Sequence, residues 1–529
     1  MKYEPTIGLE IHVELKTKSK MFCSCANGFG LEKEPNINIC PVCTGQPGVL
    51  PVINEEAVHM VIKAGLALKG QIADFAKFDR KNYFYPDLPK GYQISQYDKP
   101  LVRGGYLNVG DVNGLSRVRI REIHLEEDTG TLNHPAGVNY SLVNLNRAGV
   151  PLMELVTEPD IKSGSQAREF CRELQLIFRY LGISDAEMEN GQMRCEVNIS
   201  LRPAQLGLRE IPRIDADINT ADRRGSTSEE KIRANHAENQ RELAVLGTKV
   251  EIKNLNSFRA VEKSIDYEIK RQAEDLESGR KIIQETRGWD DARGMTVSQR
   301  TKEEAHDYRY FPEPDLPPLT RLSAISQQLS AEMPELPAQR RARFAKEYNL
   351  PAGDIETLVV NKELGDFFEG AASELRNWEK DARPKIKAAK LIKLSANYLV
   401  TELQKLLHQS GQAFKDLKIT PENFAEFIKL TAQGAVSSSG AQTVLKEMFA
   451  SGADPSHIIS EKDLRQVSDE EELIKAVDGV LSQNPGPVAD YKNGKQNALM
   501  FLVGKVMAAT RGKANPQIVA EILKKKISS

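Results

Sequence analysis

The chain has 529 residues, of which 40% are hydrophobic and 28% are charged. This length predicts about three to five domains, and the composition excludes a disordered or fibrous protein. Lys and Arg number 72 against 74 Asp and Glu, so a polyanionic partner would have to bind a local basic patch. The most apolar run, near residues 498–509, contains Lys505 and is too short to span a bilayer. The start of the chain has neither an apolar signal core nor an Arg- and Ser-rich leader, so we expect a cytoplasmic protein.

Residues 7–15 alternate between polar and aliphatic side chains, which is the period-two pattern of a β-strand. Glu10, His12 and Glu14 would therefore lie together on one face of this strand, with the aliphatic side chains on the other.

Four of the six cysteines follow as two close pairs, namely Cys23, Cys25, Cys40 and Cys43. Two pairs joined by a loop can surround a zinc ion, and four thiolates leave no position for water, so we expect a structural metal. The alternative is four unrelated thiols in a reducing cytosol. Cys171 and Cys195 stand alone and are expected to be small buried apolar groups.

The segment from Phe78 to Gln93 interleaves basic residues with tyrosines and includes Lys81. Such a segment offers phosphate contacts and rings on which unpaired bases can stack, although an aromatic loop packed on the core is the alternative. The chain has no G-x-x-x-x-G-K-[ST] motif, so a nucleotide would be held by a metal and side chains. No amidase-like glycine- and serine-rich stretch or cysteine triad stands out, so the chain is not expected to release ammonia itself.

In three later segments, acidic residues again lie among residues that favour β-strands. Residues 118–126 alternate as in a β-strand. This pattern places four polar residues on one face: Glu122, His124, Glu126 and Asp128. Glu154 lies among aliphatic residues, and Glu196 and Asn198 share a face of a strand over residues 195–201. If these faces converge, the clustered carboxylates require a cation, and oxygen-rich sites with a few imidazoles suit magnesium. A magnesium site favours phosphate chemistry; the alternative is that each acid only solvates its strand.

Helices are expected at residues 57–68 and 165–181, and strand signals end near residue 320. Residues 206–248 are highly charged and indicate a helical or mobile insertion, with a helix over 228–246. The proline-dense segment 312–318 is the best domain boundary, and a weaker one lies near residues 409–412.

The remaining chain is expected to be helical. Thr420-Pro421 predicts a helix start, and Ser468 with Glu471 forms a capping box for a helix whose apolar face carries Leu473, Val477 and Leu481. From residue 490 onward there are eight basic residues against two acidic ones, an excess that suits an RNA backbone; a solvated helical tail is the alternative.

Several long motifs closely resemble the family of B subunits of the aspartyl/glutamyl-tRNA amidotransferases. They lie at residues 7–15, 78–96, 124–128, 145–152, 308–315, 490–495 and 501–504. The resemblance covers nearly the whole chain except residues 206–248.

The resemblance implies an α+β fold in three parts. Residues 1–320 would form a sheet-based cradle domain that contains the zinc knuckle (23–43) and the insertion (206–248). Residues 321–408 would form a helical domain, and residues 409–529 a YqeY-like tail domain that binds transfer RNA.

The resemblance also implies the reaction. Members of this family work with an amidase (A) subunit and a small C subunit on glutamate misacylated to tRNA(Gln) or aspartate misacylated to tRNA(Asn). ATP and magnesium serve to phosphorylate the side-chain carboxylate, and ammonia channelled from the amidase subunit then displaces the phosphate. The product is the amide, so the complex is a carbon–nitrogen ligase.

By the same resemblance we expect magnesium ligands and catalytic residues at Glu10, His12, Glu126, Glu127, Glu154 and Glu196. Alternation places Glu127 on the opposite face from Glu126, so both can bind the metal only where the strand ends or bulges. Lys81 is expected to contact phosphate or carboxylate, and Asn198 and Glu251 are expected to bind the nucleotide. The alternatives are a non-catalytic tRNA-binding scaffold and a stand-alone metal-dependent hydrolase.

Overall fold

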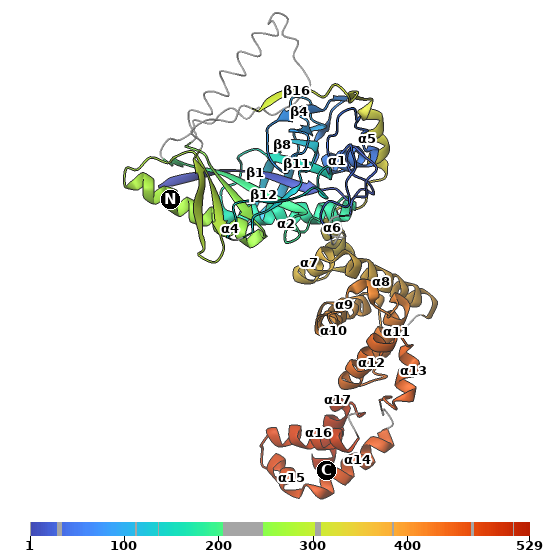
Figure 1. The fold of residues 1–529 in the computed structure, drawn as a ribbon. Coiled ribbons are helices and arrows are strands. Elements are labelled where there is room, and N and C mark those ends of the chain that lie inside the picture. Colours follow the sequence, from blue (N-terminus) through green and yellow to red (C-terminus); the bar gives the residue numbers. More distant parts are fainter. Residues whose placement is uncertain are drawn as a thin grey trace, which may run out of the picture. The chain divides into compact units, whose positions relative to one another are not determined.

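The computed structural model of the chain forms two compact units, Met1–Leu336 and Pro337–Ser529, which are described separately (Figure 1). The structure describes residues 2–28, 34–111, 114–135, 137–204, 247–301, 308–382, 386–466, 470–510 and 513–528. The charged insertion expected at 206–248 falls almost entirely outside these residues.

A large mixed sheet forms the framework of the first unit. Its strand order is β15-β14-β13-β12-β1-β11-β8-β6-β2, with β7 also paired to β8, and all neighbours are antiparallel except β13 and β14. The bounds are β1 (Tyr3–Glu14), β2 (Gln71–Ile72), β6 (Val102–Arg103), β7 (Tyr106–Asp111), β8 (Gly114–Glu127), β11 (Pro151–Thr157), β12 (Met193–Pro203), β13 (Val250–Leu255), β14 (Glu285–Asp290) and β15 (Met295–Thr301). The strands expected from alternation at 7–15, 118–126 and 195–201 are confirmed as β1, β8 and β12.

Three helices, α1 (Glu55–Ala67), α2 (Gly164–Leu181) and α4 (Phe258–Glu277), pack with the apolar face of this sheet into one core. Each begins at a side chain that accepts a backbone N–H of its first turn, from Asn54, Ser163 and Ser257 respectively. In Figure 1, α2 and α4 lie below the sheet, and β4 and β16 lie above it. The aliphatic residues of β1 are fully buried in this core, so its polar residues face the other side.

Shorter strands complete the first unit: β3 (Phe75–Ala76), β4 (Asp79–Asn82), β5 (Tyr92–Ser95), β9 (Thr131–Asn133), β10 (Leu142–Asn144), β16 (Arg309–Pro312) and β17 (Leu319–Thr320). They form a sheet of order β16-β4-β5 and the pairs β17-β3 and β10-β9. The chain therefore returns after β15 to pair with strands near its beginning.

The two isolated cysteines, Cys171 and Cys195, are both buried in the core, with their Sγ atoms 3.8 Å apart. This arrangement agrees with the expectation of small buried apolar groups.

The proline-dense segment 312–318 joins β16 to β17 inside the first unit, because both strands pair with earlier strands. The helix α5 (Leu322–Ala331) also belongs to this unit, since Leu322 and Leu329 are buried in its core. The division between the units therefore lies at Leu336 rather than at the predicted residue 320.

The second unit is helical, as expected. Its elements are α6 (Pro337–Tyr348), α7 (Ala352–Val360), α8 (Lys362–Ala382), α9 (Ala388–Tyr398), η1 (Leu399–Leu403), α10 (Gln404–Ser410), η2 (Phe414–Asp416), α11 (Pro421–Ala432), α12 (Ser438–Ser451), α13 (Pro455–Glu461), α14 (Glu470–Gln483), α15 (Pro485–Lys492), α16 (Asn497–Ala509) and α17 (Pro516–Ser528). Thr420 caps α11 and Pro421 occupies its first turn, which confirms that prediction. The expected apolar face of α14 is confirmed by the burial of Leu473 and Val477, whereas Ser468 lies outside the described residues.

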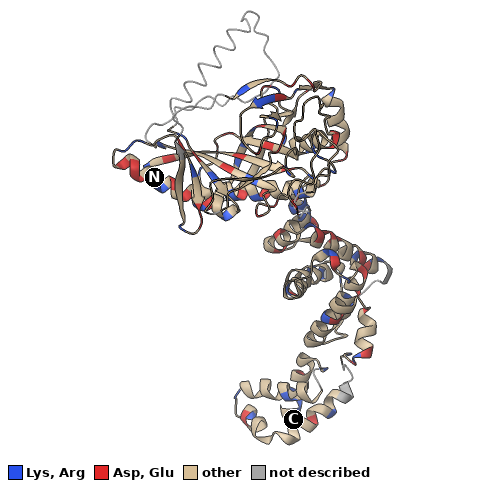
Figure 2. Cartoon of the chain, in the orientation of Figure 1, with Lys and Arg blue, Asp and Glu red and all other residues tan. Residues whose placement is uncertain are grey.

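Figure 2 shows that both basic and acidic residues occur along the helices of the second unit. No helix in the described ranges combines the length and hydrophobicity needed to cross a bilayer. The architecture as a whole, a sheet-based unit followed by a helical one, confirms the predicted α+β class.

Candidate active site

Polar residues of four adjacent strands lie in one row across the large sheet. His12 of β1 is directly opposite Glu154 of β11, which is opposite His124 of β8; on the other side, His12 is opposite Arg194 of β12. Residues directly opposite in antiparallel strands share a face and have adjacent side chains. The strand registers therefore bring together residues that the sequence separates by more than a hundred positions.

Glu154 is the centre of this row. Its Oε2 atom lies 3.3 Å from Nε2 of His12 and 3.1 Å from Nε2 of His124. Oε1 of Glu10 and Oε1 of Glu126 each lie 3.8 Å from Nε2 of His12. The ligand atoms fall into two sets, Glu10–His12–Glu154 and His124–Glu126–Glu154, and within each set they lie within 4.8 Å of one another. We call these five residues the acid–histidine cluster.

Burial and mutual charge displace the pKa values of the cluster. Burial and the Glu154 charge raise the pKa of Glu10 to about 7 and also raise that of Glu126. Burial alone would lower the pKa values of both histidines, but the bonds and charges of their acidic neighbours, Glu154 first, raise that of His12 to about 10 and that of His124 to about 8. Burial opposes ionisation of Glu154, yet the two imidazoles hold its pKa well below the usual range.

The cluster fits a divalent cation. Oε2 of Glu126 and Nδ1 of His124 are buried and make no hydrogen bond within the described part of the chain. A buried carboxylate oxygen without a donor is costly, and a cation would remove that cost. The three carboxylates of the cluster match the oxygen ligands that magnesium takes.

The polar row continues on the side of β12 and β13. Glu196 is opposite Glu10, and Nζ of Lys253 lies 2.9 Å from Glu196 and 3.6 Å from Glu251. Asn198 is opposite Glu251 in the sheet, and its buried Oδ1 has no hydrogen-bond partner among the described residues. Glu196 therefore adjoins the cluster but is paired with a lysine.

Lys81 of β4 approaches the cluster from the small sheet. Burial alone would lower its pKa, but the charges of Glu126 and Glu154 raise it overall. The Lys81 ammonium lies 5.3 Å from the ring centre of Tyr308, and burial raises the pKa of nearby Tyr310 to about 12. A cation thus lies beside the carboxylates of the cluster.

The surrounding aromatic segment is partly core and partly surface. Phe78 is buried, whereas Phe84 is 93% exposed and Tyr85 is 57% exposed. Tyr97 and Tyr310 stack with ring centres 4.2 Å apart, and Tyr97 is 59% exposed. Some rings of this segment therefore pack in the core, and others are exposed to solvent.

The structure does not bring Glu127 into the cluster. It points to the other side of β8, where it forms an ion pair with Lys90 and accepts the backbone N–H of Ile94 at 3.0 Å. Glu127 and Lys90 line a cavity of about 230 Å³ together with Cys43. The separation follows from alternation, because β8 pairs with β11 in unbroken register from Glu122 to Glu127.

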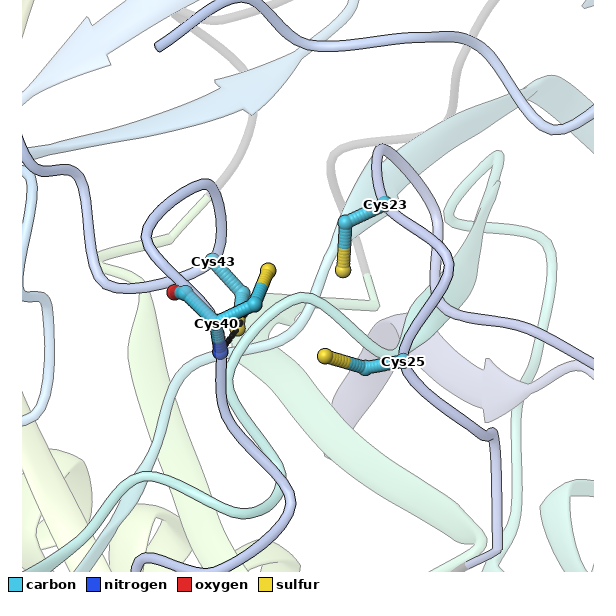
Figure 3. Close-up of side chains that lie close together, drawn as sticks. All are labelled: Cys23, Cys25, Cys40 and Cys43. Carbon is cyan, nitrogen blue, oxygen red and sulfur yellow. Dashed lines mark hydrogen bonds between the residues drawn. The ribbon is translucent and has the colours of Figure 1, made fainter.

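The four clustered cysteines converge from two loops, with Cys23 and Cys25 on one and Cys40 and Cys43 on the other (Figure 3). Sγ of Cys40 and Sγ of Cys43 are 3.8 Å apart, which matches the sulfur spacing of a tetrahedral zinc site. The hydrogen bond from Cys23, aided by the backbone N–H of Cys40 and the charge of Lys20, lowers the pKa of Cys43 to about 5. These residues could hold a metal ion with a closed coordination shell.

A buried ionic network borders the acid–histidine cluster at Glu14. Nε of Arg147 donates to Glu14 at 2.9 Å, and Arg147 also pairs with Asp128. Nη2 of Arg194 donates to the same Asp128 oxygen at 2.9 Å. The sheet face therefore presents two guanidinium groups next to the cluster.

Comparison with known proteins identifies the family. The model described as the GatB/GatE catalytic domain matches residues 5–216 and 226–327, and the GatB domain model matches residues 384–527. A protein of Carboxydothermus hydrogenoformans is 45% identical over 530 residues, covering 100% of this chain and 99% of its own. A protein of Persephonella marina is 46% identical over 523 residues, covering 99% of both chains. Both are named as the B subunit of an aspartyl/glutamyl-tRNA(Asn/Gln) amidotransferase.

The chain belongs to this family of amidotransferase B subunits.

In this member of the family, the sequence does not predict a role for His124 of the cluster or for its neighbour Lys253. Alternation placed His124 on the face of Glu126, but only the register with Glu154 shows that it completes the cluster. Lys253 carries no comparable signal, because its role as partner of Glu196 depends on a pairing between β12 and β13 that contains a register shift.

Proposed function

We propose that this chain is the B subunit of a glutamine-dependent tRNA amidotransferase that phosphorylates the side-chain carboxylate of glutamyl-tRNA(Gln), aspartyl-tRNA(Asn) or both. The conclusion draws on family membership and on one observation in particular: Glu10, His12, Glu126 and Glu154 converge from three strands into one buried cluster. The third possibility, a stand-alone hydrolase, has no observation in its favour.

The chemistry requires two steps. A carboxylate resists attack by ammonia, so one of its oxygens first attacks the γ-phosphorus of ATP, and ADP leaves with the electrons of the broken bond. Ammonia then attacks the carbonyl carbon of the acyl phosphate, and the carbon–oxygen bond to phosphate breaks. The nitrogen gives one proton to the leaving phosphate, which yields the amide and completes a carbon–nitrogen ligation.

The residues of the cluster have distinct roles in this scheme. Glu10, His12, Glu126 and Glu154 would hold magnesium, with His124 as a further ligand or as the partner that orients Glu154. Magnesium when bound would neutralise phosphate oxygens during transfer. Lys81 would contact a phosphate or carboxylate oxygen, since it already lies beside the cluster acids. Glu196, although paired with Lys253, would lie at the edge of the magnesium site, and Asn198 and Glu251 would bind the nucleotide.

Glu127 takes a different place in the proposal from the one that resemblance implied. Its pairing with Lys90 on the other face gives it no access to the cluster. We therefore assign it to the adjoining cavity and not to the magnesium site.

The remaining features fit an RNA-dependent enzyme in a complex. The exposed rings of Phe84, Tyr85 and Tyr97 suit stacking of unpaired nucleotides beside the site. The basic C-terminal helices would contact the RNA backbone. In the cytoplasm the chain would form a complex with an amidase subunit, which would supply ammonia from glutamine, and with a small C subunit. Zinc at the four cysteines would be structural.

Reconstitution of the chain with an amidase and a C subunit tests the proposal. ATP hydrolysis should depend on misacylated RNA, and His12→Ala should abolish it while retaining affinity for RNA. Equal hydrolysis by His12→Ala, or none by the wild-type complex with either misacylated RNA, would favour the non-catalytic tRNA-binding scaffold.

A further inference from the structure

Arg194 occupies a special position next to the acid–histidine cluster. It is directly opposite His12 in the antiparallel pairing of β1 and β12, so its side chain lies on the face of the cluster. Its side chain is 35% exposed, whereas those of Glu126 and Glu154 are 2% and 10% exposed. Arg194 is thus a cation on the open side of a mostly buried site.

The guanidinium of Arg194 is held at one point only. Nη2 donates to Oδ2 of Asp128 at 2.9 Å, and Asp128 is itself fixed by Arg147. A guanidinium has five N–H donors, and the remaining ones of Arg194 have no partner in the part of the chain that the structure describes. Asp128 therefore orients the group and leaves most of its donors available to a ligand.

The other cations around the cluster already have acidic partners. Lys253 is paired with Glu196 and Glu251, and Arg147 is shared between Glu14 and Asp128. Lys81 lies beside Glu126 and Glu154, where phosphate would be neutralised. A planar fork of N–H donors matches a carboxylate in a bidentate manner, which a lysine cannot do.

We propose that Arg194 binds the side-chain carboxylate of the amino acid carried by the misacylated RNA, and that Asp128 positions it. This inference rests on the proposed function and adds to it the residue that distinguishes the acidic substrate from its amide product. After amidation the second carboxylate oxygen is replaced by an NH₂ group, which cannot accept from the fork. The lost bond weakens product binding and favours release.

The test uses the reconstituted full-length complex without ATP and glutamine, so that no turnover occurs. Affinities are measured for glutamyl-tRNA and for glutaminyl-tRNA of the same sequence, and their ratio isolates the terminal group from the RNA. The variants are Arg194→Gln and Arg194→Lys. Arg202→Lys is the matched control, because Arg202 lies on the same strand and binds Glu4 at 2.7 and 3.0 Å, away from the cluster.

Wild type and Arg202→Lys should bind the glutamyl form more tightly, by about 10- to 150-fold for a charge-assisted pair. Arg194→Gln should bring the ratio close to one, and Arg194→Lys should leave it in between. In a separate turnover assay with ATP and glutamine present, KM for ATP should stay within about twofold of wild type. The proposal is overturned if the ratio is unchanged in both variants, or if KM for ATP rises while the ratio persists, which would assign Arg194 to phosphate.

Thermal unfolding shows whether the variants are folded. If neither Arg194 variant is folded, the ratio of the wild-type affinities for glutamyl-tRNA and glutaminyl-tRNA provides the test. Equal affinities contradict recognition of the carboxylate, and tighter binding of glutamyl-tRNA supports it. Failure of the proposed function would give a different result from failure of the Arg194 proposal. In that case the wild-type complex would hydrolyse no ATP with any misacylated RNA.

Discussion

Glu126 and Glu127 are neighbours in β8, yet their side chains lie on opposite faces of the sheet. Glu126 faces His12 at 3.8 Å, whereas Glu127 is paired with Lys90. Adjacent acids in one motif thus belong to two different environments, and their substitutions should have different consequences.

Glu126→Gln should lower the affinity of the chain for divalent cations by at least about 10- to 100-fold, because it removes a charged ligand and the loss of a residue that only orients a ligand already costs that much. Glu127→Gln should leave that affinity unchanged and lower stability instead, since it breaks a buried ion pair with Lys90. Calorimetric titration with Mg²⁺ or Mn²⁺ measures the first effect and urea denaturation the second. Equal loss of metal affinity in both variants would refute the assignment.

The positive charge of Lys20 should strengthen zinc binding at the zinc knuckle (residues 23–43). Its side chain is fully buried, and its Nζ donates to the carbonyl of Asn38 at 2.8 Å and lies 4.0 Å from Sγ of Cys43. Four thiolates around Zn²⁺ carry a net negative charge that this cation offsets. Lys20→Met should weaken zinc binding by about 10- to 100-fold, as measured by competition with a chelator.

The exposed neighbour Lys18 gives a matched control for that experiment, since Lys18→Met removes the same charge at a position that is not beside Cys43. The double change of Cys40 and Cys43 to serine should abolish zinc binding and destabilise the sheet unit. An intact zinc content in the double variant would exclude the knuckle as the zinc site.

Glu268 should make the sheet unit more stable at neutral than at acid pH. It is fully buried and lies 2.8 Å from Arg271, 3.0 Å from Gln272 and 3.1 Å from Arg287. Burial opposes its ionisation, but its donors, Arg271 first, lower its pKa below the ordinary 4.5. A lowered pKa in the folded state stabilises the protein above about pH 4.5, and this contribution disappears as the pH falls through the folded pKa.

Glu268→Gln should therefore cost about 3 kcal/mol of unfolding free energy at pH 7 and progressively less below pH 4.5. Urea denaturation followed by the fluorescence of Trp289, in a Trp378→Phe background, reports on the sheet unit. Glu274→Gln on the exposed side of α4 is the control. A pH-independent difference would show that the charge of Glu268 is not the source of its effect.

The basic C-terminal helices should carry part of the RNA affinity. Removing residues from 410 onward is a poor test, because Phe424 and Phe427 of α11 pack against Phe367 and Tyr398 at ring-centre distances of 5.5 and 5.2 Å. Replacing the exposed lysines Lys492, Lys505 and Lys524 by glutamine avoids that damage.

This triple variant should bind RNA more weakly and with a shallower salt dependence, by up to about 0.9 in the log–log slope for each phosphate that is no longer neutralised. Filter binding over a range of salt concentrations provides the measurement. The same change at three exposed lysines of the sheet unit, Lys263, Lys270 and Lys281, is the control. An unchanged slope would exclude these helices from the RNA interface, and the zinc content should not change in any case.

Local pattern was sufficient to predict which face each polar residue occupies. Alternation placed Glu10 and His12 together, placed Glu126 beside His124, and separated Glu127 from both. These predictions succeed because a strand's period of two depends only on the local backbone.

The convergence of the cluster could not be predicted in that way. The meeting of His12, Glu154 and His124 depends on the registers of β1, β11 and β8, which tertiary packing sets. The same reason explains why Lys253 was missed and why the boundary near residue 320 was placed before α5, whose two buried leucines belong to the core of the first unit.

The central claim is that the carboxylate is phosphorylated before it is amidated, and oxygen labelling tests it most directly. Glutamyl-tRNA carrying ¹⁸O in both side-chain carboxylate oxygens is converted by the complex, and the phosphate is analysed by mass spectrometry. One labelled oxygen should appear in phosphate for each amide formed, with none transferred by His12→Ala. Amide formation with unlabelled phosphate would contradict the account.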